Sequence, residues 1–250
     1  MIETTDLDGV TLVTLRRPPV NALDTQLNEA ITSTFGALEG PVVLTGAGRC
    51  FCAGVDLATL LDGSDEDTSR FLESLVAGFL AIFDYPGPVV AAVNGHSLAG
   101  GCVIAMAADV RYMSSGLIGL TEILVGVPFP ITAIEISRQV MGPSATSAAL
   151  GGQPVPPEQA LRLGWIDATP AADELLDVAV ARARTLGALS PQAYAFTKEQ
   201  LHRPARTAIA NGAAQDAKAR LSWQSGETRA RIEAFVANLR RAREGRVDDR

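Results

Sequence analysis

The spacing of apolar residues predicts alternating strands and helices in the first half of the chain. From Gly9 to Leu15, β-branched and apolar residues form a short run that ends at two arginines and two prolines, which is typical of a strand. After Asp24, a favourable helix N-cap, apolar residues recur every three or four positions and predict a helix with one buried face: Leu27, Ile31, Phe35 and Leu38. Two apolar runs, 42–44 and 89–93, predict buried strands.

Beyond Pro130 the pattern becomes almost wholly helical. Helices are predicted at 131–141, 157–163, 172–186, 191–202, 206–223 and 227–243. The stretch 46–54 and the acidic, polar stretch 62–69 are predicted as loops, the second of them mobile. A boundary at Ser190 and Pro191 divides an α/β core, residues 1–190, from a helical C-terminal region, residues 191–250, whose apolar side chains need the core or another subunit to cover them.

Composition indicates a folded globular protein. The 250 residues are 47% hydrophobic and 20% charged, which excludes a disordered or fibrous chain. Three cysteines cannot form a disulfide framework, and with only two histidines no metal site is expected. The first residues lack the features of a signal peptide, so a cytoplasmic location is expected. The apolar stretch 88–108 is interrupted near its middle by Asn94, Gly95 and His96, and predicts a strand, a turn and a buried helix rather than a membrane span.

Charge is distributed unevenly along the chain. Residues 198–250 hold 12 basic and 7 acidic residues, whereas the whole chain has a net charge of −7. The acidic body and an aromatic content of 5% argue against nucleic acid as a partner. The basic tail is either a solvated helical face or a contact to an anionic ligand or an acidic neighbouring subunit.

Two glycine-containing motifs fit known enzyme classes incompletely. The stretch 45–49 follows a strand, but Phe51 stands where a dinucleotide-binding motif needs its third glycine, so that class is excluded. The stretch 95–99 is similar to the nucleophile elbow of serine hydrolases, with Ser97 as the nucleophile. Ala99 replaces its last glycine and only His202 follows the serine, so a buried structural serine is the simpler interpretation and the hydrolase remains an alternative.

A third candidate consists of two loops. One has the sequence FCAGVDL (51–57), and the other has the sequence NGHSLAGGC (94–102), which ends a strand and opens a helix. Each loop can direct a backbone N–H at one point, and Gly100 lies at a helix N-terminus, where N–H groups are unpaired. Two such donors would form an oxyanion hole. Small residues at a tight contact between helix and strand are the structural alternative.

Together with further motifs, these loops resemble the crotonase superfamily, also called the enoyl-CoA hydratase/isomerase family. The resemblance covers nearly the whole chain and rests on five motifs: RPPVNAL (17–23), FCAGVDL (51–57), VVAAVNGHSLAGGC (89–102), IGLTE (118–122) with Gly126 and Pro128, and ALRLGWID (160–167). It implies an α/β fold in which ββα units form a spiral, and C-terminal helices that build a homotrimer or a dimer of trimers. It implies an acyl-CoA thioester as substrate and no separate cofactor.

The resemblance also assigns residues to the binding of substrate. The amides of Val55 and Gly100 would form the oxyanion hole. The adenine and pantetheine parts of CoA would lie near Ala22, Ala53, Asp56 and Leu57. The candidates for contact with the phosphates are Arg16, Arg17 and the basic groups of the C-terminal helices. The candidates for an apolar wall around the acyl chain are Leu98, Val103, Leu124, Pro128 and Phe129.

The acid groups distinguish the reactions of this family. Hydratases that resemble this chain carry two glutamates, one of them three residues after the oxyanion glycine, where this chain has Val103. The second position matches Glu122. One carboxylate suffices to move a proton from C2 to C4, so the motifs predict a Δ3,Δ2-enoyl-CoA isomerase with Glu122 as base and acid. The alternatives are an enoyl-CoA hydratase and an acyl-CoA-binding protein without turnover.

Overall fold

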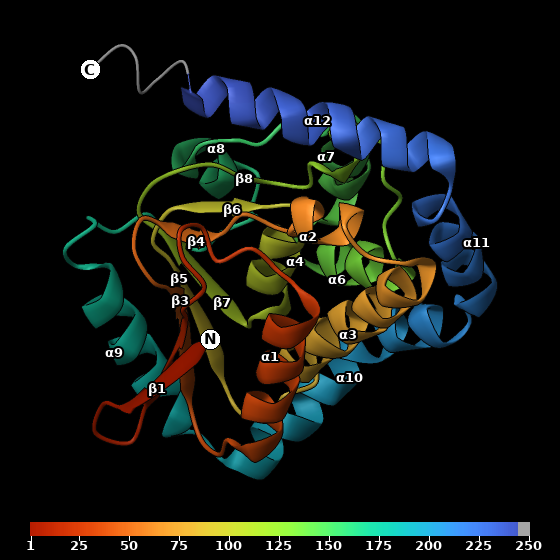
Figure 1. Cartoon of the computed structure of the whole chain (residues 1–250). Coiled ribbons are helices and arrows are strands. Elements are labelled where there is room, and N and C mark those ends of the chain that lie inside the picture. Colours follow the sequence, from red (N-terminus) through yellow and green to blue (C-terminus); the bar gives the residue numbers. More distant parts are fainter. Residues whose placement is uncertain (245–250) are drawn as a thin grey trace.

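The strands form two sheets that the chain visits in turn. In the computed structural model, which describes residues 1–244, the larger sheet has the order β1 (Ile2–Asp6), β2 (Thr11–Leu15), β3 (Val42–Gly46), β5 (Val89–Val93) and β7 (Val110–Met113). The smaller sheet has the order β4 (Cys50–Cys52), β6 (His96–Leu98) and β8 (Ile118–Gly119). Strand β1 pairs antiparallel with β2, whereas β2, β3, β5 and β7 pair parallel with one another, as do β4, β6 and β8. Each turn of the chain therefore adds one strand to each sheet, and the predicted spiral of ββα units is confirmed (Figure 1).

The helices of the first half enclose the core between them and the sheets. Helix α1 (Thr25–Ala37) packs on α3 (Asp65–Phe83), and α3 packs on α4 (Gly100–Ala107), in which every residue is buried. Two short helices each follow a strand of the smaller sheet: α2 (Leu57–Leu61) comes after β4, and α5 (Glu122–Val125) comes after β8. The burial of α4 matters for function, because its N-terminal end carries Gly100.

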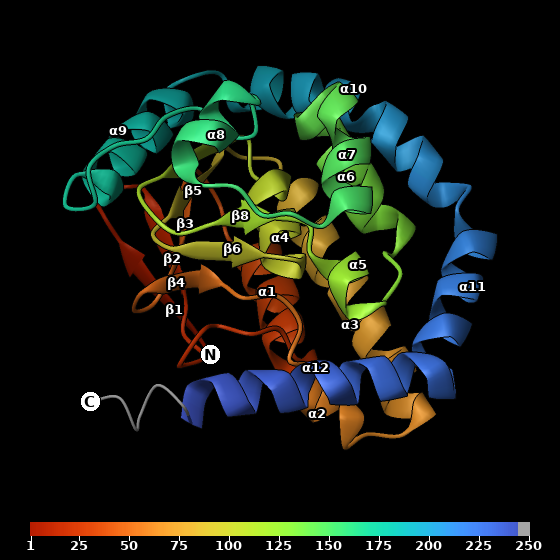
Figure 2. The same ribbon diagram turned by 90° about the horizontal axis from the view of Figure 1, so that it is seen from above.

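The C-terminal helices wrap around this core. They are α6 (Ile131–Met141), a 3₁₀ turn (Gly142–Ser144), α7 (Ala145–Gly151), α8 (Pro157–Arg162), α9 (Leu175–Gly187), α10 (Pro191–Ala210), α11 (Ala213–Trp223) and α12 (Gly226–Glu244). Helix α9 covers the outer face of the larger sheet, α10 packs along α6, and α12 crosses over α2 and α5 (Figures 1 and 2). Within residues 1–244, no helix is long and apolar enough to cross a membrane.

Three local expectations were wrong, each for a physical reason. The stretch 62–69 is not a mobile loop, because Ser64 and Asp67 form a capping box that starts α3. The loop 46–54 contains the strand β4, whose three residues are too few to show a period. The predicted interruption between 202 and 206 is absent: α10 continues through Pro204, supported by its packing on α6.

The proposed boundary at Ser190 and Pro191 coincides with the turn between α9 and α10. Ser190 accepts a hydrogen bond from the Ala193 amide at 3.4 Å and caps α10. The division into a core and an oligomerisation region remains a prediction, and residues 245–250 of the second region lie outside the described residues.

Candidate active site

The two glycine-containing loops lie in direct contact. A Cβ placed on Gly54, which has φ +85°, would lie 2.8 Å from the Cβ of Ala99 and 3.5 Å from the amide nitrogen of Gly100. Only glycine permits both that backbone conformation and that approach. The loop 51–57 therefore meets the N-terminus of α4, as the sequence predicted.

The amides of Val55 and Gly100 are left outside the backbone ladders. Leu23 forms an isolated parallel bridge with Val55, and it uses the carbonyl of Gly54 and the amide of Asp56, both at 2.8 Å. The amide of Val55 consequently faces away from Leu23. Gly100 is the first residue of α4, where an amide has no acceptor within the helix.

Ala99 orients the Gly100 amide at a cost in backbone strain. Its φ of +51° and ψ of −126° lie in a region that alanine rarely adopts. The amide of Ala99 donates to the Gly119 carbonyl at 2.8 Å, where β6 pairs with β8. Strain of this kind persists where the surroundings enforce it, and it is frequent at functional sites.

Glu122 lies close to the same end of α4. It is the first residue of α5 and only 8% exposed, and among residues 1–244 its Oε2 atom has no hydrogen-bond partner. Burial raises the pKa of Glu122 to about 8, although the amides at Thr121 and Glu122 oppose this. The chain reaches this end of α4 three residues before Glu122, because the Gly119 carbonyl accepts the amide of Ala99 at 2.8 Å. Burial and the charge of Glu122 both raise the pKa of Cys102, in the first turn of α4.

Arg17 and Asp56 are paired with each other. The Nη2 atom of Arg17 lies 2.7 Å from Oδ2 of Asp56, and its Nε atom lies 2.8 Å from Oδ2 of Asp24. Its Nη1 atom donates to the carbonyl of Ala22 at 3.2 Å. Arg17 thus joins the segment 22–24 to the loop 51–57, and the sequence analysis did not predict this pairing because Arg17 and Asp56 lie 39 positions apart.

Comparison with known proteins supports one family. A model of the family described as "Enoyl-CoA hydratase/isomerase" matches residues 5–241. The probable enoyl-CoA hydratase echA8 of Mycobacterium bovis is 30% identical over 215 residues, which cover 81% of each chain. The chain belongs to the enoyl-CoA hydratase/isomerase family.

Solved structures of this family have the same fold. Human mitochondrial delta3-delta2-enoyl-CoA isomerase superposes with a TM-score of 0.90 at 21% identity, covering 96% of this chain and 98% of that one. An enoyl-CoA hydratase, EchA3, from Mycobacterium ulcerans superposes with a TM-score of 0.78 at 26% identity, covering 87% and 98%. The resemblance to the crotonase superfamily is confirmed, and the protein is an acyl-CoA enzyme of this family, either a hydratase or an isomerase.

The other residues expected at the substrate differ in exposure. Val103 is fully buried, one turn into α4, while Leu98 and Phe129 are partly buried. Ala22, Ala53 and Leu57 are also partly buried; Ala53 and Leu57 lie in the loop 51–57, and Ala22 precedes Leu23, which pairs with that loop. Leu124, another candidate for the apolar wall around the acyl chain, is 55% exposed and therefore contributes less to such a wall than a buried side chain would.

The structure gives no support to a serine hydrolase. Ser97 is fully buried, and its hydroxyl donates to the carbonyl of Gly101 at 3.0 Å. His202 stacks on Phe83 instead, with ring centroids 3.7 Å apart, and burial lowers its pKa to about 4. Ser97 is a structural residue of the contact between β6 and α4.

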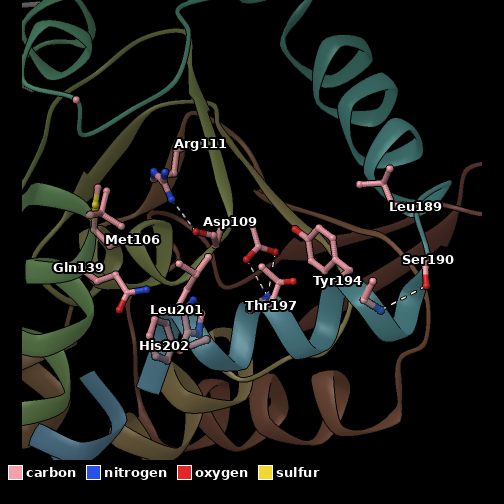
Figure 3. A pocket seen from close by; sticks show the side chains of 16 residues that line it. Met106, Asp109, Arg111, Gln139, Leu189, Ser190, Tyr194, Thr197, Leu201 and His202 are labelled. Carbon is pink, nitrogen blue, oxygen red and sulfur yellow. Dashed lines mark hydrogen bonds and ion pairs between the residues drawn. The ribbon is translucent and has the colours of Figure 1, made fainter. Parts of the chain in front are cut away.

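A cavity of about 730 Å³ lies at the opposite end of α4, between α6 and α10 (Figure 3). Its buried ions are paired: Lys198 contacts Asp109 at 2.9 Å, and Nη2 of Arg111 lies 3.2 Å from Asp167. Of the family motifs, only ALRLGWID reaches its lining, through Gly164. Within residues 1–244, no group of side chains could hold a metal ion.

Asn21 is the residue that the sequence analysis overlooked. It is fully buried with φ +53°, and its Nδ2 atom donates to the carbonyls of Cys50 at 2.7 Å and Phe51 at 3.2 Å. Its Oδ1 atom accepts the amide of Arg17 at 3.0 Å. The only available signal was its place in the motif RPPVNAL.

Proposed function

We propose that this enzyme moves the double bond of an enoyl-CoA from C3 to C2 and that Glu122 is the group that moves the proton. The observation that carries this proposal is the buried carboxyl group of Glu122, whose Oε2 atom has no hydrogen-bond partner among the described residues, with Val103 where the similar hydratases have a second acid. Valine cannot transfer a proton, so the activation of water by a second carboxylate has no counterpart here.

The proposed mechanism needs only the groups described above. The thioester oxygen accepts hydrogen bonds from the amides of Val55 and Gly100. The carboxylate of Glu122 removes a proton from C2, and the electron pair moves onto the thioester oxygen as an enolate. The two amides stabilise the negative charge that develops there. Glu122 then returns the proton to C4 as the double bond forms between C2 and C3.

The raised pKa of Glu122 suits both halves of this transfer. A pKa of about 8 gives a stronger base than an ordinary carboxylate and an acid that still releases its proton near neutral pH. Leu98, Val103 and Phe129 are proposed to keep water from the acyl chain. Ala22, Ala53, Asp56 and Leu57 are proposed to lie along the CoA portion.

The test is conversion of a 3-enoyl-CoA to the conjugated 2-enoyl-CoA, followed by ultraviolet absorbance. Replacing Glu122 by Gln keeps the shape and removes the base, so kcat is expected to fall about 10³–10⁴-fold while the melting temperature does not fall. Unchanged turnover by Glu122→Gln would overturn the proposal. Binding of acyl-CoA with no conversion by the wild type would favour a protein without turnover.

A hydratase is the second candidate, and the similarity to proteins named as hydratases favours it. Wild-type enzyme should then add water to crotonyl-CoA faster than it isomerises a 3-enoyl-CoA. The isomerase proposal expects the reverse order of rates, measured on the same enzyme preparation.

We also propose that the chain forms a homotrimer or a dimer of trimers through its C-terminal helices. Leu189, Phe196 and Leu201 are between 54% and 64% exposed on or beside α10, a cost in apolar exposure that a neighbouring subunit would remove. Analytical ultracentrifugation of the full chain, with Phe196→Glu as the comparison, tests this assembly.

A further inference from the structure

We propose that Arg17 is a positioning residue that holds the Val55 amide in place by joining the segment 22–24 to the loop 51–57, an inference that rests on the proposed function. Its guanidinium reaches Asp56 at 2.7 Å, Asp24 at 2.8 Å and the Ala22 carbonyl at 3.2 Å. Three partners, on the segment 22–24 and the loop 51–57, make this side chain a clamp rather than a ligand for substrate.

Both carboxylates of the clamp also start helices. Asp24 accepts the amide of Leu27 at 2.8 Å and caps α1, and Asp56 accepts the amide of Thr59 at 3.2 Å and caps α2. Each cap therefore has a fixed position relative to its helix. By binding both caps, Arg17 fixes the start of α2 relative to the start of α1.

Val55 lies directly between the clamped groups. Leu23 precedes Asp24, and it exchanges hydrogen bonds with Gly54 and Asp56, the two neighbours of Val55. A shift of either capping residue therefore moves the Val55 amide as well. The backbone of Arg17 is itself held, because its amide donates to Asn21.

The charges around Arg17 argue against a direct contact with CoA phosphates. The hydrogen bonds and charges of Asp56 and Asp24 outweigh burial and raise the pKa of Arg17, while the same contact helps to lower the pKa of Asp56. One guanidinium between two carboxylates leaves a net negative charge at this place. Such a cluster would repel a phosphate rather than bind it.

The experiment compares two thioester substrates with the same acyl group. One is the thioester of CoA, and the other is the thioester of pantetheine, which lacks the nucleotide of CoA and its phosphates. For Arg17→Gln, kcat is expected to fall on the order of 100-fold with both thioesters, because a displaced amide no longer meets the oxyanion. KM should change little with either. Arg17→Lys keeps the charge without the planar fork and should show an intermediate loss of kcat.

Two further variants keep the result interpretable. Asp56→Asn preserves the acceptor for the Thr59 amide but loses the ion pair, so it should lower kcat in the same way as Arg17→Gln and by a smaller factor. Arg70→Gln removes an exposed arginine that pairs with Glu29 at 2.9 Å and should leave kcat and KM unchanged.

Each alternative role gives a different result. A rise in KM confined to the CoA thioester would show that Arg17 binds phosphate and would overturn the clamp. A lower melting temperature with unchanged kcat in the folded variant would reduce Arg17 to a structural role and overturn it too. A wild-type enzyme that converts neither thioester would overturn the proposed function and the clamp together, whereas an active wild type with an unaffected Arg17→Gln would overturn the clamp alone.

Discussion

The buried polar groups at the two ends of helix α4 differ in whether they have partners within the protein. At the C-terminal end, Nη1 of Arg111 donates to the carbonyl of Ala108 at 2.6 Å, and Lys198 pairs with Asp109. At the N-terminal end, the Gly100 amide has no acceptor within the helix and Glu122 has an unpartnered oxygen among the described residues. Lys198 and Glu122 are equally buried, at 7% and 8% exposed.

This difference separates stability from function. A buried ion that has its counter-ion and its hydrogen bonds is satisfied within the protein and needs no ligand to complete its environment. A buried carboxyl group without a partner lowers stability, and its persistence is explained when a substrate completes its environment. The cavity beside Lys198 has a volume of about 730 Å³, but the buried ions that line it are already paired within the protein.

The strongest way to break this comparison is to remove the lysine. Lys198→Met leaves the largely buried carboxylate of Asp109 without its counter-ion, although the Val89 amide still donates to it at 2.8 Å. We expect a loss of about 3–5 kcal/mol in the free energy of unfolding, measured by urea denaturation. The kcat of the folded enzyme should be unchanged, which is the reverse of the result for Glu122→Gln.

A second replacement serves as the control for the lysine variant. Asp109→Asn in the Lys198→Met background removes the unpaired charge and keeps an acceptor for Val89, so part of the stability should return. If the single variant unfolds at the wild-type urea concentration, the Lys198 pair is not a structural element and the comparison fails.

The pH dependence of kcat/KM tests the N-terminal end of α4, where Glu122 lies. The proposed base must be deprotonated, and burial raises the pKa of Glu122 to about 8. We therefore expect kcat/KM to rise about tenfold per pH unit below that pKa and to level off above it. A profile that levels off between pH 4 and 5 would mean that the acting carboxylate is exposed and is not Glu122.

The smallest expected effect concerns Ala99, the strained residue of the loop 94–102 that contacts Gly54. Ala99→Gly relieves the positive φ, so the free energy of unfolding should rise by about 1 kcal/mol. Thermal denaturation monitored by circular dichroism measures it. A loss of stability would show that the Ala99 methyl contact with Gly54 outweighs the strain.

The sequence predicted the parts of the site that depend on local pattern. The loop 51–57 meets the N-terminal end of α4, as the two motifs predicted, although the strand β4 before Gly54 was predicted as part of a loop. The helix after Asp24 followed from spacing and capping. Local pattern is sufficient wherever the determining contacts lie within a few residues.

Long-range polar contacts could not be predicted in this way. Nothing near Arg17 in the chain indicates that Asp56 is its partner, and nothing near Glu122 indicates that it lacks one. Tertiary packing likewise overrides the local signal at Pro204, which lies inside α10 instead of ending it. These features depend on residues that the fold alone brings together.

The most direct test follows a hydrogen isotope through the reaction. A 3-enoyl-CoA carrying deuterium at C2 is converted in ordinary water, and the product is examined for deuterium at C4. One carboxyl group that serves as both base and acid predicts that part of the deuterium arrives at C4 with the wild type and that Glu122→Gln abolishes this transfer. Full turnover by Glu122→Gln, or a wild-type 2-enoyl-CoA product that carries no deuterium at C4, would contradict it.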